Sequence, residues 1–139
     1  MIWVIVIFII GYILIKYFLA LNKDNNDLQG KTLDDKFHFI VDEINESAFN
    51  GNGHVTYIDK REFNLYEVGQ NQIVKFHYSS GHLSIIWKYK YFQKEVILER
   101  QFNDVRNLSI FDQQRIAKAM ITEMTIVVEN HKANVLNDI

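Results

Sequence analysis

Five histidines are the side chains of this sequence best suited to bind a metal ion or to act as general bases. No two stand four residues apart, and none belongs to an H-x-H or H-E-x-x-H motif, so the usual ligand spacing is missing. His77 and His82 flank the turn residues Ser80 and Gly81, and we expect them to project to opposite faces of that hairpin. The sequence therefore predicts no metal site and no cofactor. The other histidines are His38, His54 and His131.

Serine nucleophiles and paired carboxylates are the other candidates for catalysis. Ser79–His82 places serines beside a histidine, but the chain has no G-x-S-x-G motif, and hairpin turns select serine and glycine for backbone reasons. The adjacent acids at 34/35 and 42/43 diverge on a helix, which makes them poor acid–base partners. We predict no catalytic residues, and an unrecognised hydrolase is the least favoured alternative.

Lys75, Lys88, Lys90 and Lys94 form a modest basic patch with Phe92 nearby. Basic sheet faces with interleaved aromatic residues bind single-stranded nucleic acid. However, residues 32–139 hold 12 basic and 15 acidic residues, a net charge of about −3. Because the expected excess of positive charge is missing, nucleic acid is not the favoured partner.

The apolar residues, which must form the elements that position the polar side chains described above, are unevenly distributed along the chain. Of the 139 residues, 48% are apolar and 14% aromatic, and none is proline or cysteine. The first 21 residues hold 19 of the 67 apolar residues, and the remaining 118 have an ordinary apolar content. This composition excludes intrinsic disorder, and the absence of cysteine excludes a disulfide scaffold and papain-like chemistry.

Residues 1–21 are predicted to form a transmembrane anchor, since about 21 residues of helix span roughly 30 Å, the thickness of a hydrocarbon core. Trp3 and Tyr17 are placed as interfacial aromatics, Lys16 can extend to the headgroups, and Gly11 is the one glycine. A cleaved signal peptide and a buried core helix are the alternatives. The first lacks basic residues before the apolar run and a small residue at position 18, and the second would need a polar face.

The lysines that follow this segment favour a cytoplasmic position for the rest of the chain over an extracytoplasmic one. Lys16, Lys23, Lys31 and Lys36 lie on that flank, and the N-terminal flank has no lysine or arginine. Residues 22–31 are polar and are predicted to be a linker. Residues 32–139 then form one soluble domain.

This domain is predicted to be α+β, with a helix, an antiparallel meander of about four to five strands and a second helix, both helices packed on one face of the sheet. Thr32 and Ser109 begin the helices, each with an aspartate three residues later, as in a capping box. The first helix ends at the turn 50–53 and the second at about Lys132. The predicted strands are Val55–Ile58, Glu62–Val68, Gln72–Ser79, His82–Phe92 and Glu95–Phe102.

Three turns define a register for this meander. A turn at Ser80-Gly81 pairs Phe76 with Ile85. Turns at Gln93-Lys94 and Gln70-Asn71 pair Tyr89 with Leu98 and Leu65 with Phe76, so the large apolar residues share one face. On the open face, the same register sets Lys88 across from Glu99, Ile97 across from Lys90, Ile73 across from Lys88 and Ile86 across from Lys75.

A face that combines isoleucines with lysines indicates a contact surface for a protein or for a second copy of the chain. The candidate interaction surface is Ile73, Lys75, Ile86, Lys88, Lys90 and Ile97. The leading hypothesis is a single-pass, membrane-anchored, non-catalytic interaction domain that acts as a subunit, accessory or immunity-like inhibitor of a membrane-associated assembly. The alternative is a cytoplasmic ligand sensor that clusters its anchor. In the alternative, a pocket between the sheet and the helices is lined by Tyr57, Phe76, Trp87 and Tyr89.

Overall fold

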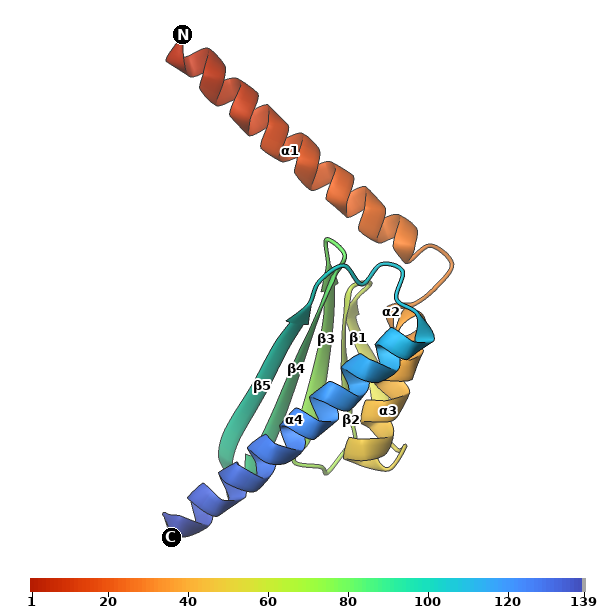
Figure 1. Ribbon diagram of the computed structural model, residues 1–139, viewed down its shortest axis with the longest axis vertical. Helices are drawn as coiled ribbons and strands as arrows, with labels where there is room; N and C mark the ends of the chain where they lie inside the picture. The colour runs from red at the N-terminus through yellow and green to blue at the C-terminus, as the bar shows by residue number, and fades with distance from the viewer. Residues whose placement is uncertain (139) are drawn as a thin grey trace.

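The computed structural model describes residues 1–138, and these form one long apolar helix followed by an α+β domain (Figure 1). The five strands make one antiparallel sheet in the order β1-β2-β3-β4-β5, a simple meander. The α+β class and the five-stranded meander are therefore confirmed. The elements are α1 (Ile2–Asp27), α2 (Leu33–Lys36), α3 (His38–Phe49), β1 (His54–Asp59), β2 (Glu62–Tyr66), β3 (Gln72–Ser79), β4 (His82–Tyr91), β5 (Lys94–Phe102) and α4 (Ile110–Asn137).

The helix α1 continues six residues into the segment that was predicted to be a linker. Extending a formed helix adds one hydrogen bond for each residue fixed, which outweighs the weak helix propensity of asparagine and aspartate. Only the five residues 28–32 separate α1 from α2. Leu28 packs against the core of the domain. The connection is consequently much shorter than a ten-residue flexible linker.

The first helix of the domain is kinked at Phe37, which the sequence pattern did not predict. Phe37 has φ −112° and ψ 32° and separates α2 from α3, although its backbone N–H still donates to Leu33 O and its carbonyl accepts from Val41 N. Its ring is buried and lies 5.7 Å from that of Tyr78. The non-helical backbone of Phe37 thus occurs at a residue whose side chain is buried in the core. The predicted capping bond is also missing, because the Thr32 side chain makes no capping hydrogen bond.

The ends of α3 and α4 follow identifiable signals. Asn50 adopts a left-handed conformation, φ 51°, and ends α3 where the sequence predicted. The side chain of Ser109 accepts a hydrogen bond from Asp112 N at 3.2 Å, so this predicted cap is confirmed. The helix α4 runs to Asn137 instead of ending near Lys132. Val135, in the additional turn, is buried, which gives that turn a packing reason to form.

The register between β3 and β4 is the predicted one, with Phe76 opposite Ile85, and the other two registers differ by two residues. The turn between β4 and β5 is Phe92-Gln93, at φ 49° and 68°, so Trp87 lies opposite Leu98. The loop between β2 and β3 is longer than the predicted two-residue turn, and Phe63 lies opposite Phe76. A shift of two residues keeps the large apolar side chains on their predicted face, whereas a shift of one would reverse them.

One face of the sheet, together with α2, α3 and α4, forms a single hydrophobic core. The rings of Phe63 and Phe76 stack at 4.7 Å, and Ile40, Ile44 and Met120 from the helices join the same cluster. In Figure 1, α3 and α4 cross the same side of the sheet. The polar alternates on the strands therefore remain on the opposite side, which is the candidate interaction surface.

A disulfide test discriminates the two registers, because the chain has no cysteine of its own. We expect Lys88→Cys with Ile97→Cys to form a disulfide under mild oxidation, since these residues lie directly opposite. The control, Lys88→Cys with Glu99→Cys, is a diagonal pair about 7–8 Å apart and is expected to remain reduced. Free-thiol titration after oxidation measures both. A disulfide in the 88/99 pair alone would restore the register predicted from sequence.

Candidate interaction surface

The open face of the sheet is built from cross-strand rows that mix apolar, basic and acidic side chains. One row that crosses all five strands runs His54, Tyr66, Ile73, Lys88 and Ile97 from β1 to β5. The next row runs Thr56, Asn64, Lys75, Ile86 and Glu99. All six residues of the predicted surface lie on this face, and β2 adds Tyr66 and Asn64, which sequence analysis left out.

Lys75 is not an isolated cation, because Glu62 on β2 pairs with it. The Lys75 Nζ lies 2.9 Å from Glu62 Oε1, and His77 Nδ1 lies 3.9 Å from the other carboxylate oxygen. Exposed pairs of this kind contribute little to stability, but the carboxylate offsets the charge of Lys75 toward a partner. Only the correct β2–β3 register would have revealed this pairing from sequence.

Lys88 has a different setting, between two isoleucines. It lies opposite Ile73 on one side, as predicted, and opposite Ile97 on the other, where the sequence had predicted Glu99. The prediction that Ile97 opposes Lys90 is wrong for the same reason, since Lys90 lies opposite Glu95. Ile97 is 51% exposed, whereas Ile73 and Ile86 are half-buried.

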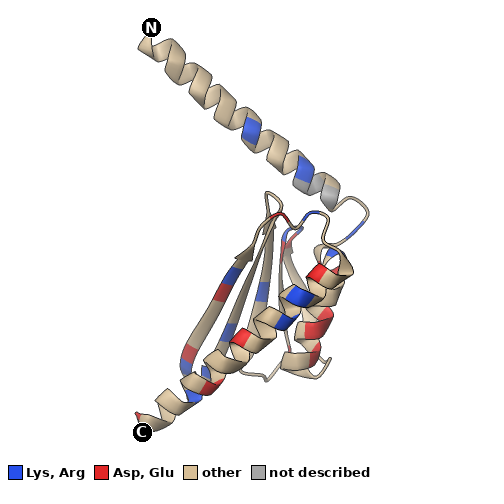
Figure 2. Ribbon diagram, viewed as in Figure 1, with Lys and Arg blue, Asp and Glu red and all other residues tan. Residues whose placement is uncertain are grey.

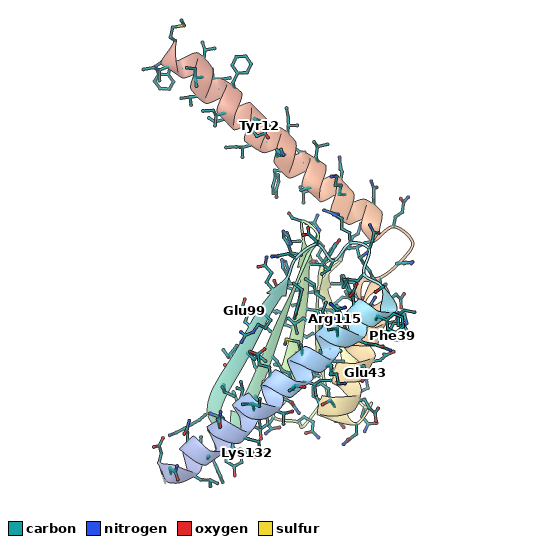
Figure 3. All side chains as sticks on the ribbon, in the orientation of Figure 1. Tyr12, Phe39, Glu43, Glu99, Arg115 and Lys132 are labelled. Carbon is teal, nitrogen blue, oxygen red and sulfur yellow. The ribbon has the colours of Figure 1, made fainter. Side chains whose placement is uncertain are left out.

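Glu99 is an acidic residue in the row next to Lys88 and Ile97. It lies opposite Ile86 and extends away from α4 (Figure 3). Ile73, Lys88 and Ile97 thus form an apolar strip with one cation at its centre, and carboxylates stand in the neighbouring rows. We call these three residues the Lys88 strip.

The side chains considered for metal binding or catalysis do not converge. The register places His77 and His82 on the same face, contrary to the prediction, but the described residues contain no group of three His, Asp or Glu side chains able to hold a metal ion. Ser80 and Gly81 have φ of 53° and 75°, the geometry of a tight hairpin turn. The geometry of the turn accounts for a serine and a glycine at these two positions.

Tyr57 and Asp34 connect β1 to α2. The Tyr57 hydroxyl donates to the Asp34 carboxylate and accepts from the Asp34 backbone N–H at 3.1 Å. Partial burial, reinforced by the acceptor carboxylate, raises the pKa of Tyr57 above its usual value. The tyrosine therefore stays protonated at neutral pH and holds the two elements together, which is a structural role.

The predicted anchor residues lie on a helix whose apolar membrane-length window is not buried. Residues Ile2–Lys23 form one helix that is long and apolar enough to cross a membrane. Trp3 and Tyr17 are exposed, and no atom outside the helix backbone comes within 4 Å of the Cβ position at Gly11. The Lys16 ammonium lies 5.5 Å from the ring centre of Tyr12. Figure 2 shows that the basic residues of α1 are in its half nearer the domain.

The four aromatic residues proposed to line a ligand pocket do not surround one cavity in the described part of the chain. Trp87 and Tyr89 border a cavity of about 170 Å³, which is smaller than usual ligand sites. Phe76 is fully buried in the core, and Tyr57 borders a separate cavity beside residues 28–32. The Trp87 Nε1–H donates to Gln72 Oε1 at 2.9 Å, so its polar atom is satisfied internally.

Comparison of the chain with models of known protein families, with curated proteins and with solved structures finds no match. The geometry described above is therefore the basis for any functional proposal.

Substitutions at two isoleucines of the sheet, Ile97 and Ile85, test whether the Lys88 strip contributes to the stability of the fold. We expect Ile97→Thr to change the free energy of unfolding by no more than about 0.5 kcal/mol, because the side chain is half exposed and threonine retains strand preference. Ile85→Ala, on the buried face, should cost about 2–5 kcal/mol. Urea unfolding of the full chain in detergent measures both, and it is followed by tryptophan fluorescence in a Trp3→Phe background so that Trp87 is the one reporter. Equal losses would mean that Ile97 serves the fold.

Proposed function

We propose that this protein is a single-pass, membrane-anchored, non-catalytic interaction domain, which serves as a subunit, accessory or inhibitor of a membrane-associated assembly. The observation that carries the proposal is the combination of an apolar helix with uncovered side chains, a five-residue connection and a folded domain with a mixed apolar and basic sheet face. Each part favours tethered binding, and none of the candidate catalytic side chains converges.

The anchor is supported by the exposure of α1. Side chains such as Ile5, Phe8 and Ile13 are more than half exposed, and burying an apolar side chain is worth about 1.5–3 kcal/mol. Such a helix is stable where a bilayer supplies the apolar surroundings. The lysines after the span favour a cytoplasmic domain.

The short connection makes tethering effective. The helix continues four residues past Lys23, which is about 6 Å, before the five residues 28–32 lead into the domain. The domain is thereby confined next to the membrane, and its effective concentration toward a partner in the same membrane rises accordingly.

The Lys88 strip is the surface that we assign to partner binding. A complementary partner surface would place an apolar patch over Ile73 and Ile97, with a carboxylate to pair with Lys88. A desolvated charge pair surrounded by apolar contacts supplies specificity as well as affinity. A second copy of this chain is the other occupant that the experiment below distinguishes.

Cysteine labelling tests the anchor and the orientation together. Asn52→Cys places the only thiol of the chain in an exposed turn at the far end of the domain. We expect the protein to remain in the membrane pellet after alkaline carbonate extraction, and the thiol to react with an impermeant maleimide only after permeabilisation. The cysteine-free parent is the matched control for labelling. Release by carbonate would refute the anchor, and labelling of intact cells would refute the cytoplasmic orientation.

Site-specific photocrosslinking tests the assigned surface. With p-benzoylphenylalanine at Ile97, we expect one crosslinked protein band in intact membranes, and we expect Lys88→Glu in the same chain to abolish it. The same photoprobe at Thr122, exposed on α4, is the control and should not yield this band. A band of twice the chain mass would identify a second copy as the partner. A band that survives Lys88→Glu, or that forms equally from Thr122, would contradict the assignment.

A further inference from the structure

A second feature of the domain is a cavity of about 330 Å³ at the end that joins α1. Its wall comes from α2, the start of α3, residues 105–108 and the first turn of α4. These segments meet near the connection to α1 (Figure 1). The volume lies in the range of small-molecule sites, unlike the smaller cavity beside Trp87.

Among the charged side chains that line this cavity, basic ones outnumber acidic ones. Lys31, Lys36 and Arg106 line it, and Asp35 is the one carboxylate among its lining residues. The first turn of α4 contributes Ile110, so the positive end of a 28-residue helix lies at the same place. Basic side chains at a helix N-terminus favour an anion, and a phosphate group fits lysine and arginine best.

Gln113 supplies an independent observation that points to a ligand. It lines the cavity, is only 6% exposed and is the one buried polar residue among those the structure describes. Its Nε2 donates to Lys36 O at 3.1 Å, but its Oε1 finds no hydrogen-bond partner within the described chain. A buried acceptor without a donor is costly, so this amide oxygen has unused capacity to accept a hydrogen bond.

The ligand chemistry follows from these two observations. A fully ionised anion has no hydrogen to donate to Gln113 Oε1, whereas a hydroxyl group has. The Oε1 atom has essentially no accessible surface in this structure, so a hydroxyl reaches it only after the side chains around it rearrange. Of the basic side chains, Lys36 is already engaged, because its Nζ donates to Arg106 O at 2.5 Å. We propose that this cavity binds a hydroxyl-bearing phosphate ester, with the phosphate on the basic wall and a hydroxyl donating to Gln113 Oε1.

Two sources can supply this chemistry: a soluble polyol phosphate and the headgroup of a lipid such as phosphatidylglycerol. Binding of a lipid headgroup depends on the proposed membrane anchor, because the anchor would hold the cavity at the headgroup layer. Binding of a soluble ester does not depend on the anchor. The site would make the domain responsive to a ligand at a place distinct from the Lys88 strip.

The experiment measures binding of glycerol 3-phosphate to the full chain in phosphatidylcholine nanodiscs by isothermal titration calorimetry. We expect saturable binding that weakens about tenfold in Gln113→Met, which removes the acceptor at similar volume. Lys31→Gln should weaken it by a similar factor. Sulfate, which has no hydroxyl at neutral pH, should bind more weakly and equally to the parent and to Gln113→Met.

Matched controls lie on the same helix. Gln114→Met and Lys118→Gln change exposed neighbours outside the cavity wall and should leave the affinity for glycerol 3-phosphate unchanged. The thermal midpoint of Gln113→Met should change little, since removing the unpaired acceptor Oε1 offsets the loss of the hydrogen bond from Nε2 to Lys36 O. A lower affinity without a lower midpoint separates ligand binding from a purely structural role.

Nanodiscs that contain phosphatidylglycerol distinguish the two sources. A lower apparent affinity for glycerol 3-phosphate in these discs identifies the lipid headgroup as a competitor, and an unchanged affinity identifies the soluble ester. Absence of saturable binding in phosphatidylcholine discs, or binding that Gln113→Met and Lys31→Gln do not weaken, would overturn the proposal. If the chain fails to enter nanodiscs, the anchor is refuted, and the same titration in detergent still tests the cavity.

Discussion

Burial of one face of the five-stranded meander is the constraint on which the rest of the domain depends. Phe63, Phe76 and Ile85 are fully buried, and they meet the helices through Ile40 and Met120. Because strand side chains alternate, burying this face determines which residues remain on the other. The Lys88 strip is therefore a consequence of the core: Ile73, Lys88 and Ile97 are outside because their neighbours along each strand are inside.

The same constraint explains which parts of the fold could be predicted from sequence. Placing Val74, Phe76 and Tyr78 on one face requires only the period of two, and the large apolar residues assigned to that face in β2, β3 and β4 are buried there. The β3–β4 register also follows from sequence, because Ser80-Gly81 has the residues of a tight turn. The α+β class and the five-stranded meander follow from these two signals together.

The remaining registers could not be predicted, because the turns depart from common turn chemistry. Phe92 adopts φ 49°, which is rare for an aromatic residue, so the turn rules had no reason to select Phe92-Gln93. Both registers are displaced by two residues, a change that hydrophobic patterning cannot detect. For this reason the members of the candidate surface were predicted, but their neighbours were not: Lys88 lies between isoleucines, and Glu62 pairs with Lys75. Gln113 was missed because a glutamine in a helix has no sequence signal for burial.

Under the proposed function, the Lys88 strip and the basic cavity are accessible to different kinds of binding partner. The Lys88 strip crosses β3, β4 and β5 toward the end of the sheet where β3 begins, on the side away from the helices, where a protein partner can bind. The basic cavity is at the end joined to α1, where only the residues 28–32 intervene. Lys31 belongs both to that connection and to the cavity wall, so a ligand held there would also restrain the connection. Restraining the connection would limit the orientations that the domain, and with it the Lys88 strip, can adopt relative to α1.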